Sequence, residues 1–367
     1  MGPLLPDDST LSSRLVRRTR GIVIESLALL LVTVLFPVLL LGAALVDAIL
    51  WVRRRKPWMG VRLVAMLWWF LFGELRGITG LLLINLLSFG RDTSWRRHAV
   101  YRLRQHWAAS HLGGVRVLFG LRMEMEGLEL AAPGPVLVLI RHASIIDNAL
   151  PDAVIGRTHG IGLRFVLKRE LRMLPTIDIG GRWVPTNFVR RASDDPEREL
   201  ANLRLLAVEL EPDEGVLIYP EGTRCTAAKL ARAKAVIAER QPEIAPLAER
   251  LNNLLPPRLG GTLALLEQAR GTDVVVCGHV GLDGFERVSD IWSGGLVGTT
   301  VRVRFWRHAA ADVPAERDAL VAWLYERWQA LDDWVGEQLA ATGAVRRTIA
   351  ADQKLPPAPA AGASLGE

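Results

Sequence analysis

The sequence predicts an α/β domain with a mixed sheet flanked by helices, preceded by a membrane-embedded helical hairpin. Three observations support this fold class. Two long apolar stretches lie near the start, strand-like runs then alternate with helical patterns, and the last residues are rich in Ala, Pro and Gly. We expect four parts: a basic N-terminal segment (1–20), a membrane-embedded region (21–90), a folded domain (91–341) and a disordered tail (342–367).

The two apolar stretches, 22–52 and 61–89, predict the hairpin. The first is long enough to cross a bilayer and too long for a cleavable signal peptide. Pro37 lies near its middle, whereas the second contains Glu74 and Arg76, which are costly at bilayer depth. Two arrangements stay open. The hairpin either spans the membrane twice, or bends at Pro37 and dips into the cytoplasmic leaflet with every basic cluster at the lipid headgroups.

Charge and cysteine content narrow the class of partner. The chain has 367 residues and a net charge of +6, which implies an anionic partner such as membrane lipid or a phosphorylated substrate. We do not expect nucleic acid, because the basic residues flank apolar spans and are not interleaved with exposed aromatic residues. The two cysteines, Cys225 and Cys277, form no CxxC pair, so we expect neither a disulfide framework nor a zinc site.

From about residue 95 onward, strand and helix patterns alternate. Apolar or alternating runs predict strands at 121–126, 135–140, 163–168, 216–219, 274–277 and 301–306. Amphipathic spacing predicts helices at 95–112 and 320–335. Asp195-Pro196 predicts another helix start, because a capping residue followed by proline suits the first helical position.

The strand predicted at 135–140 ends in Arg141-His142, and Asp147 follows five positions after the histidine. Ser144-x-x-Asp147 has the spacing of a capping box, which would open a helix and place His142 on a strand-to-helix turn. A histidine is a natural general base near neutral pH, and a carboxylate can fix its tautomer. The alternative is that Ser144 and Asp147 only cap a helix and that His142 is incidental.

A second polar cluster, at 221–224, follows the strand predicted at 216–219 and reads Glu-Gly-Thr-Arg. Its glycine lets a backbone come close to a ligand, and its arginine can bind a phosphate or carboxylate through two hydrogen bonds. Basic pairs also lie at 168–169 and 190–191. Open α/β sheets bind ligands beyond the carboxyl ends of their strands, so these groups suit a phosphate-bearing acceptor. Taken singly, each is equally typical of a solvated turn.

The H-x4-D pattern of 142–147 and the EGTR pattern of 221–224 together resemble the glycerolipid acyltransferase family. Its type members are the 1-acyl-glycerol-3-phosphate acyltransferases. Further blocks follow in the family's order, and the resemblance covers roughly 95–340. The stretch 255–260 is similar to the branch that includes lysophospholipid acyltransferases such as those acting on lysocardiolipin.

The resemblance implies a glycerol-phosphate-acyltransferase-like α/β fold and a set of roles. His142 would be the general base, and Asp147 the carboxylate that orients it. The other implied residues would bind the acceptor, four by lining its site and two by holding its phosphate: Glu221, Gly222, Thr223 and Arg224, with Lys168 and Arg191.

Two positions depart from the family pattern. The residue before the histidine is often asparagine, and here it is Arg141. A neighbouring cation favours the neutral, proton-accepting form of a histidine, and we also expect Arg141 to bind the acceptor phosphate. The fourth block usually carries a proline after its strand, whereas here the strand is followed by His279, for which we expect a packed or capping role.

The expected function is transfer of a fatty acyl group from acyl-CoA or acyl-carrier protein to the free hydroxyl of lysophosphatidate, giving phosphatidate. The resemblance implies no metal and no cofactor, membrane lipid as a partner, and a cell-membrane location with the active site facing the cytoplasm. A thiol has a pKa of about 8.5, so the thiolate can leave without a dedicated acid. Backbone N–H groups near Ser144 would stabilise the oxyanion.

Three alternatives to this function stay open. Two keep the chemistry and change the acceptor, to another lysophospholipid or to glycerol phosphate. The third is a non-catalytic membrane protein that uses the fold to bind anionic lipid.

Overall fold

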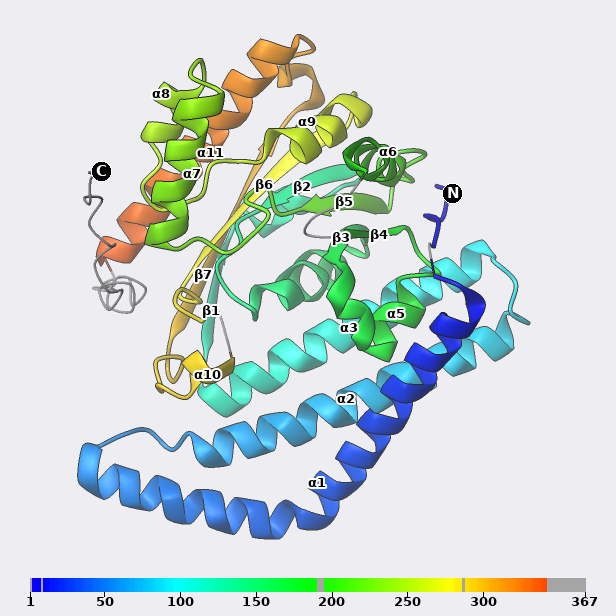
Figure 1. Cartoon of the computed structure of the whole chain (residues 1–367), viewed down its shortest axis with the longest axis vertical. Coiled ribbons are helices and arrows are strands. Elements are labelled where there is room, and N and C mark those ends of the chain that lie inside the picture. Colours follow the sequence, from blue (N-terminus) through cyan, green and yellow to red (C-terminus); the bar gives the residue numbers. More distant parts are fainter. Residues whose placement is uncertain (1, 8, 190–194, 286–287, 342–367) are drawn as a thin grey trace, which may run out of the picture.

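The computed structural model describes residues 2–7, 9–189, 195–285 and 288–341 (Figure 1). The tail predicted to be disordered, 342–367, lies outside these residues. The centre is a seven-stranded mixed sheet with the order β1-β7-β6-β2-β5-β3-β4. Its strands are β1 (Arg122–Glu126), β2 (Val136–Ile140), β3 (Gly162–Lys168), β4 (Thr186–Val189), β5 (Glu214–Ile218), β6 (Asp273–Val280) and β7 (Thr300–His308).

The strand directions decide where a site can form. Strands β6, β2, β5, β3 and β4 run parallel to one another, whereas β7 is antiparallel to β6 and parallel to β1. The carboxyl ends of five neighbouring strands therefore meet at one edge of the sheet. The predicted α/β fold with a mixed sheet is confirmed, and six of the seven strands coincide with predicted ones.

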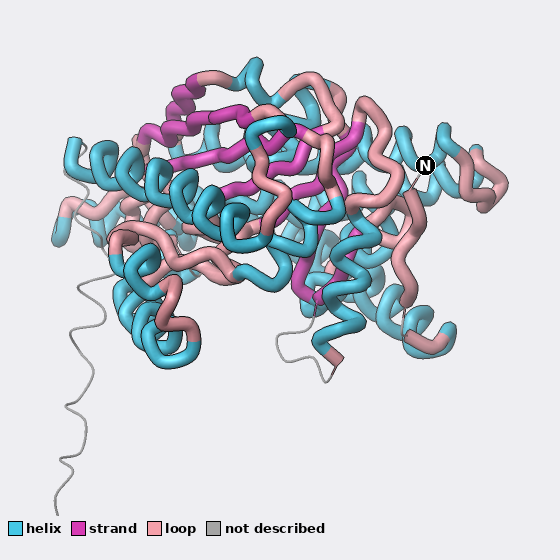
Figure 2. The backbone as a smooth tube through the Cα atoms, turned by 90° about the horizontal axis from the view of Figure 1, so that it is seen from above, coloured by secondary structure: helices cyan, strands magenta, loops and turns pink. Residues whose placement is uncertain are grey.

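Helices cover both faces of the sheet, as Figure 2 shows. Residues of β2 alternate between the two faces: Leu137 and Leu139 join a core with α6, α9 and α11, whereas Val138 and Ile140 join a core with α3. The domain helices are α3 (Ser94–Phe119), α4 (Arg157–His159), α5 (Pro175–Gly180), α6 (Pro196–Leu206), α7 (Ala227–Arg240), α8 (Ala245–Glu249), α9 (Leu259–Gln268), α10 (Val288–Ile291) and α11 (Arg317–Ala341).

The predicted hairpin consists of α1 (Leu11–Arg54) and α2 (Gly60–Leu87), both long and apolar enough to cross a membrane. Helix α1 bends partway along its length in Figure 1, and Pro37 lies inside it. Proline removes a hydrogen bond and crowds the preceding turn, which accounts for the bend. Asp47 links α1 to the start of α2. Its buried carboxylate accepts hydrogen bonds from Met59 N at 3.1 Å and from Val61 N at 2.9 Å.

One face of α2 packs against α3 and α5 rather than pointing outward. Glu74 is fully buried and accepts from Trp107 Nε1 at 3.0 Å, while Thr176 Oγ1 donates to its other oxygen. Arg76 donates to Ser110 Oγ at 3.1 Å. The two charged residues that would be costly in lipid are thus bonded to protein groups.

The basic N-terminal segment is also bound to the domain. Arg17 and Arg18 donate to the buried carboxylate of Asp178 in α5 at 2.9 and 2.8 Å, and Arg14 pairs with Asp7 at 3.2 Å. These three arginines are paired with carboxylates of the protein, and the expectation that every basic cluster lies at lipid headgroups stays a prediction.

Candidate active site

His142 and Asp147 form a hydrogen-bonded pair beyond the carboxyl end of β2. His142 Nδ1 lies 3.1 Å from Asp147 Oδ1 and 3.3 Å from Oδ2, and both side chains are buried. Because an ionised carboxylate can only accept, Nδ1 must carry the ring hydrogen. Nε2 then presents its lone pair, which is the tautomer required of a general base.

Asp147 is held by the turn that it follows. One carboxylate oxygen, Oδ2, accepts from Ala143 N and Ser144 N, each at 2.7 Å, and Asp147 begins a short 3₁₀ helix. The predicted capping box forms only in part, because Ser144 Oγ accepts from Ile146 N at 3.1 Å and donates to a carbonyl. Burial alone would raise the pKa of Asp147, but hydrogen bonds from His142 and His279 hold it well below its usual range.

The backbone N–H groups of 143–146 are all engaged within the protein. Ala143 and Ser144 donate to Asp147, Ile145 donates to Phe285 O at 3.2 Å, and Ile146 donates to Ser144 Oγ. The expectation that N–H groups near Ser144 stabilise an oxyanion is therefore not supported, because these donors already have acceptors.

Glu221 supports the backbone of the base. After β5 the chain turns, and the buried Glu221 carboxylate accepts from His142 N at 2.8 Å and from Leu255 N at 3.0 Å. The ring of Tyr219 packs on that of His142 with 4.5 Å between centroids, and its hydroxyl donates to Asp147 O. Glu221 therefore faces protein N–H groups, not open space where an acceptor would bind.

The rest of the EGTR turn lies beside this pair. Gly222 has φ +63, and a Cβ there would lie 2.7 Å from Arg258 Cδ, so both conformation and space require glycine. Thr223 and Arg224 are half-buried, and Lys229 Nζ donates to Arg224 O at 3.0 Å. The turn brings these residues to the same edge of the sheet as His142, as the parallel strands predict.

The predicted basic ligands have different placements. Lys168 ends β3, two strands from β2 at the same edge of the sheet, and is half-buried. Arg191 lies outside the described residues. Arg141 is buried, pairs with Asp283 and donates to His279 O, so it does not reach an acceptor phosphate. Sequence reasoning missed Asp283, since no pattern linked it to Arg141.

Asp283→Asn is expected to destabilise the protein by about 3–5 kcal/mol, because it leaves the buried Arg141 guanidinium without its counter-charge. The shift in denaturant midpoint in detergent measures the loss. Glu267→Gln is a control, because it breaks an exposed pair with Arg317 and should cost less than about 1 kcal/mol. Equal, small losses in both variants would contradict the assignment.

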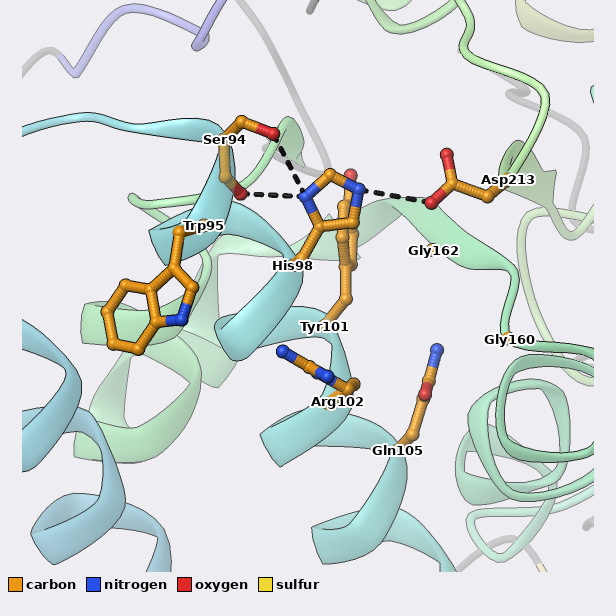
Figure 3. A pocket seen from close by; sticks show the side chains of 9 residues that line it. All are labelled: Ser94, Trp95, His98, Tyr101, Arg102, Gln105, Gly160, Gly162 and Asp213. Carbon is orange, nitrogen blue, oxygen red and sulfur yellow. Dashed lines mark hydrogen bonds and ion pairs between the residues drawn. The ribbon is translucent and has the colours of Figure 1, made fainter.

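A hollow of about 550 Å³ lies elsewhere, at the opposite edge of the sheet (Figure 3). It is bordered by α3, by Gly162 at the start of β3 and by Asp213 just before β5. His98 lies between Ser94 and Asp213, with Nε2 3.1 Å from the Asp213 carboxylate. The hollow contains none of the predicted site residues, so it is separate from the candidate site.

Part of the chain is similar to known acyltransferases. Residues 122–248 match the family model described as Acyltransferase. The chain is 25% identical over 210 residues to mouse 1-acyl-sn-glycerol-3-phosphate acyltransferase epsilon, covering 54% of this chain and 56% of that protein. It is 22% identical over 271 residues to lysophosphatidylinositol acyltransferase 10 of Caenorhabditis elegans, covering 70% and 67%.

Among solved structures, the chain aligns with the 1-acyl-sn-glycerophosphate (LPA) acyltransferase PlsC from Thermotoga maritima. The TM-score is 0.49 and the identity 14%, over 75% of this chain and 96% of that chain. The residues that match the Acyltransferase family model, 122–248, lie within the α/β domain. The chain spans 56% of the length of the mouse relative.

The pH dependence of activity should reveal Glu221. Burial raises the pKa of Glu221 to about 7, although N–H groups of His142 and Leu255 oppose the rise. Below that pH the carboxyl gains a proton and can no longer accept both N–H groups, so activity should fall as pH falls. We predict that proton uptake by Glu221 contributes to the acidic limb of log kcat/KM. Glu221→Gln should make that limb less steep, and an unchanged slope would contradict this.

Proposed function

We propose that the chain is a membrane-bound acyltransferase that moves a fatty acyl group from acyl-CoA or acyl-carrier protein to the free hydroxyl of lysophosphatidate, giving phosphatidate. The observation that carries the proposal is His142, whose Nδ1 is committed to Asp147 and whose Nε2 is left as a proton acceptor. The match of 122–248 to the Acyltransferase family model supports acyl transfer, and the name of the mouse relative supports the acceptor.

The reaction follows from this geometry. His142 Nε2 takes the proton from the acceptor hydroxyl as its oxygen attacks the thioester carbonyl carbon. The tetrahedral intermediate collapses, the C–S bond breaks and the thiolate leaves. The thiolate then takes the proton back from the imidazolium, which returns His142 to its starting form. Asp147 stabilises the imidazolium while it exists.

Three cationic residues are proposed to hold the acceptor phosphate. Arg224 follows β5 and Lys168 ends β3, at the edge where His142 lies, and Arg191 is kept from the family resemblance. Arginine binds phosphate through two parallel hydrogen bonds, and lysine acts as a point charge. Glu221 and Gly222 are proposed to shape the turn, and Thr223 to line the acceptor site beside them.

The hairpin is proposed to lie in one leaflet of the cell membrane, with the site facing the cytoplasm. Leu30, Val34 and Leu41 on α1 are among its many exposed apolar side chains, which suit contact with lipid. Glu74 and Arg76 bond to α3 and α5, so α2 stays beside the domain. Burial of Glu74 against the domain, together with the bond of Arg76 to α3, favours this arrangement over two full crossings.

A second acceptor is favoured by one observation. The Caenorhabditis elegans relative is named for lysophosphatidylinositol, and it matches a larger share of this chain than the mouse relative does. We therefore keep lysophosphatidylinositol as the alternative acceptor.

An acceptor screen tests the proposal. Purified protein in lipid nanodiscs would be given acyl-CoA or acyl-carrier protein with lysophosphatidate, lysophosphatidylinositol or glycerol phosphate. Product would be identified by mass spectrometry. Phosphatidate formed fastest is the expected result, and a preference for lysophosphatidylinositol would replace the acceptor. Anionic-lipid binding without turnover on any acceptor would overturn the enzymatic proposal.

A further inference from the structure

We propose that His279 is a positioning residue for His142: it fixes both the Asp147 carboxylate and the end of β2 from the adjacent strand β6. The inference rests on the proposed acyl transfer and assigns a residue that the reaction itself does not touch. It replaces the packed or capping role expected from the sequence.

His279 contacts the His142–Asp147 pair through a single nitrogen. Its side chain is fully buried on β6, with Nε2 3.0 Å from Arg141 O and 3.5 Å from Asp147 Oδ2. A carbonyl and a carboxylate are both acceptors, so Nε2 must carry the ring hydrogen. The other nitrogen, Nδ1, is buried and has no hydrogen-bond partner among the described residues. The ring therefore serves as a donor to this site alone.

Arg141 and His279 form hydrogen bonds to each other in both directions. While His279 donates to the carbonyl of Arg141, the guanidinium of Arg141 donates to the carbonyl of His279. Arg141 N also donates to Cys277 O at 3.0 Å, which extends the pairing of β2 with β6 past Ile140. The two residues thus hold each other across neighbouring strands, and this fixes the point from which His142 projects.

Asp283 completes the arrangement by balancing charge. It pairs with the buried Arg141 guanidinium, and its other oxygen accepts from Gly281 N at 3.2 Å. Attraction to Asp283 therefore turns the arginine toward β6 and away from the space beside His142. The arginine that departs from the family pattern and the histidine of the fourth block are parts of one structure.

This arrangement fixes which donors each oxygen of the Asp147 carboxylate faces. Its Oδ2 accepts from two backbone N–H groups and faces His279 Nε2 from a third side, which leaves Oδ1 for His142. Removing the His279 donor loosens the orientation of the carboxylate and withdraws stabilisation of its negative charge. A carboxylate that is less well oriented holds the ring of His142 less firmly, so proton transfer at Nε2 should slow.

Several ionisable groups face the two histidines. They are Asp147, Glu221 and Tyr219 around His142, and Asp147, Arg141 and Asp283 around His279.

The test compares His279→Leu with His279→Gln in nanodiscs. Leucine removes the donor, whereas the glutamine amide can place a donor near the position of Nε2. We expect His279→Leu to lower kcat roughly 10- to 100-fold with little change in acceptor KM. His279→Gln should restore most of kcat.

His111→Leu is the matched control, because it removes another buried imidazole, between α2 and α3, away from the site. It should leave kcat unchanged. Wild-type protein that transfers no acyl group would defeat the proposed function itself. Active wild type with a His279→Leu variant of unaltered kcat would overturn this inference alone. So would a loss of kcat that glutamine does not restore while the protein stays folded.

Discussion

His142→Ala is expected to lower kcat/KM for acyl transfer by roughly 1,000- to 10,000-fold, the largest effect of any single substitution at this site. The reason is the tautomer of His142. Asp147 fixes the hydrogen on Nδ1, so Nε2 supplies the lone pair that accepts the hydroxyl proton. Alanine leaves no group there that can accept it. Acceptor binding should change little, since the phosphate is held by other residues.

The comparison needs a histidine that has no such role. His106 lies on an exposed part of α3, and His106→Ala should transfer acyl groups at the wild-type rate. Rates would be measured with radiolabelled acyl-CoA under single-turnover conditions, so that product release does not mask the chemical step. Transfer that survives His142→Ala undiminished would remove the histidine from the mechanism.

Asp147→Asn is expected to lower the rate almost as much, because it reverses the hydrogen-bond directions around His142. The asparagine oxygen can still accept from Ala143 N and Ser144 N, which leaves its amide NH2 facing His142 Nδ1. Nδ1 must then accept, the ring hydrogen moves to Nε2 and the base is lost. In a Ser-His-Asp triad the same substitution lowers the rate about 10,000-fold through the same change of tautomer, and we expect a loss here at the lower end of the range for His142→Ala, roughly 1,000-fold.

Asp152→Asn separates this effect from loss of stability. Asp152 is also buried, but its carboxylate pairs with Arg104 at 2.6 Å and not with His142. Both variants should lower the unfolding temperature, because each removes a buried charge from its partners. Only Asp147→Asn should lose activity far below that temperature. Comparable residual activity in the two variants would show that Asp147 acts through stability alone.

Most of the fold follows from short-range patterns in the chain. Strand β2 is apolar at every position because both of its faces are buried, and Asp195 caps α6 as its proline predicts. Strand β4 was not predicted. It has four residues, Thr186–Val189, and lies at the sheet edge, so its length and polar start give no strand pattern.

The sequence predicts which residues of the site come together wherever the direction of the strands alone decides their position. Because β2 and β5 are parallel neighbours, His142 and Glu221 follow the same edge, and the structure joins them by a hydrogen bond of 2.8 Å. The direction of the strands does not determine where an individual side chain points. Arg141 turns toward Asp283, and the amides near Ser144 turn toward Asp147, through contacts that no local spacing specifies.

The arginines of α1 have a consequence for how the chain is assembled during synthesis. Arg17 and Asp178 are 161 residues apart, and Arg172 binds Asp7 across 165. Both apolar helices are complete long before either partner has left the ribosome. Arg17 and Arg18 therefore lack their Asp178 partner while the hairpin forms, and they become fixed to α5 only when the domain folds. Docking of the N-terminus is thus a late step, and it couples completion of the domain to the final placement of the hairpin.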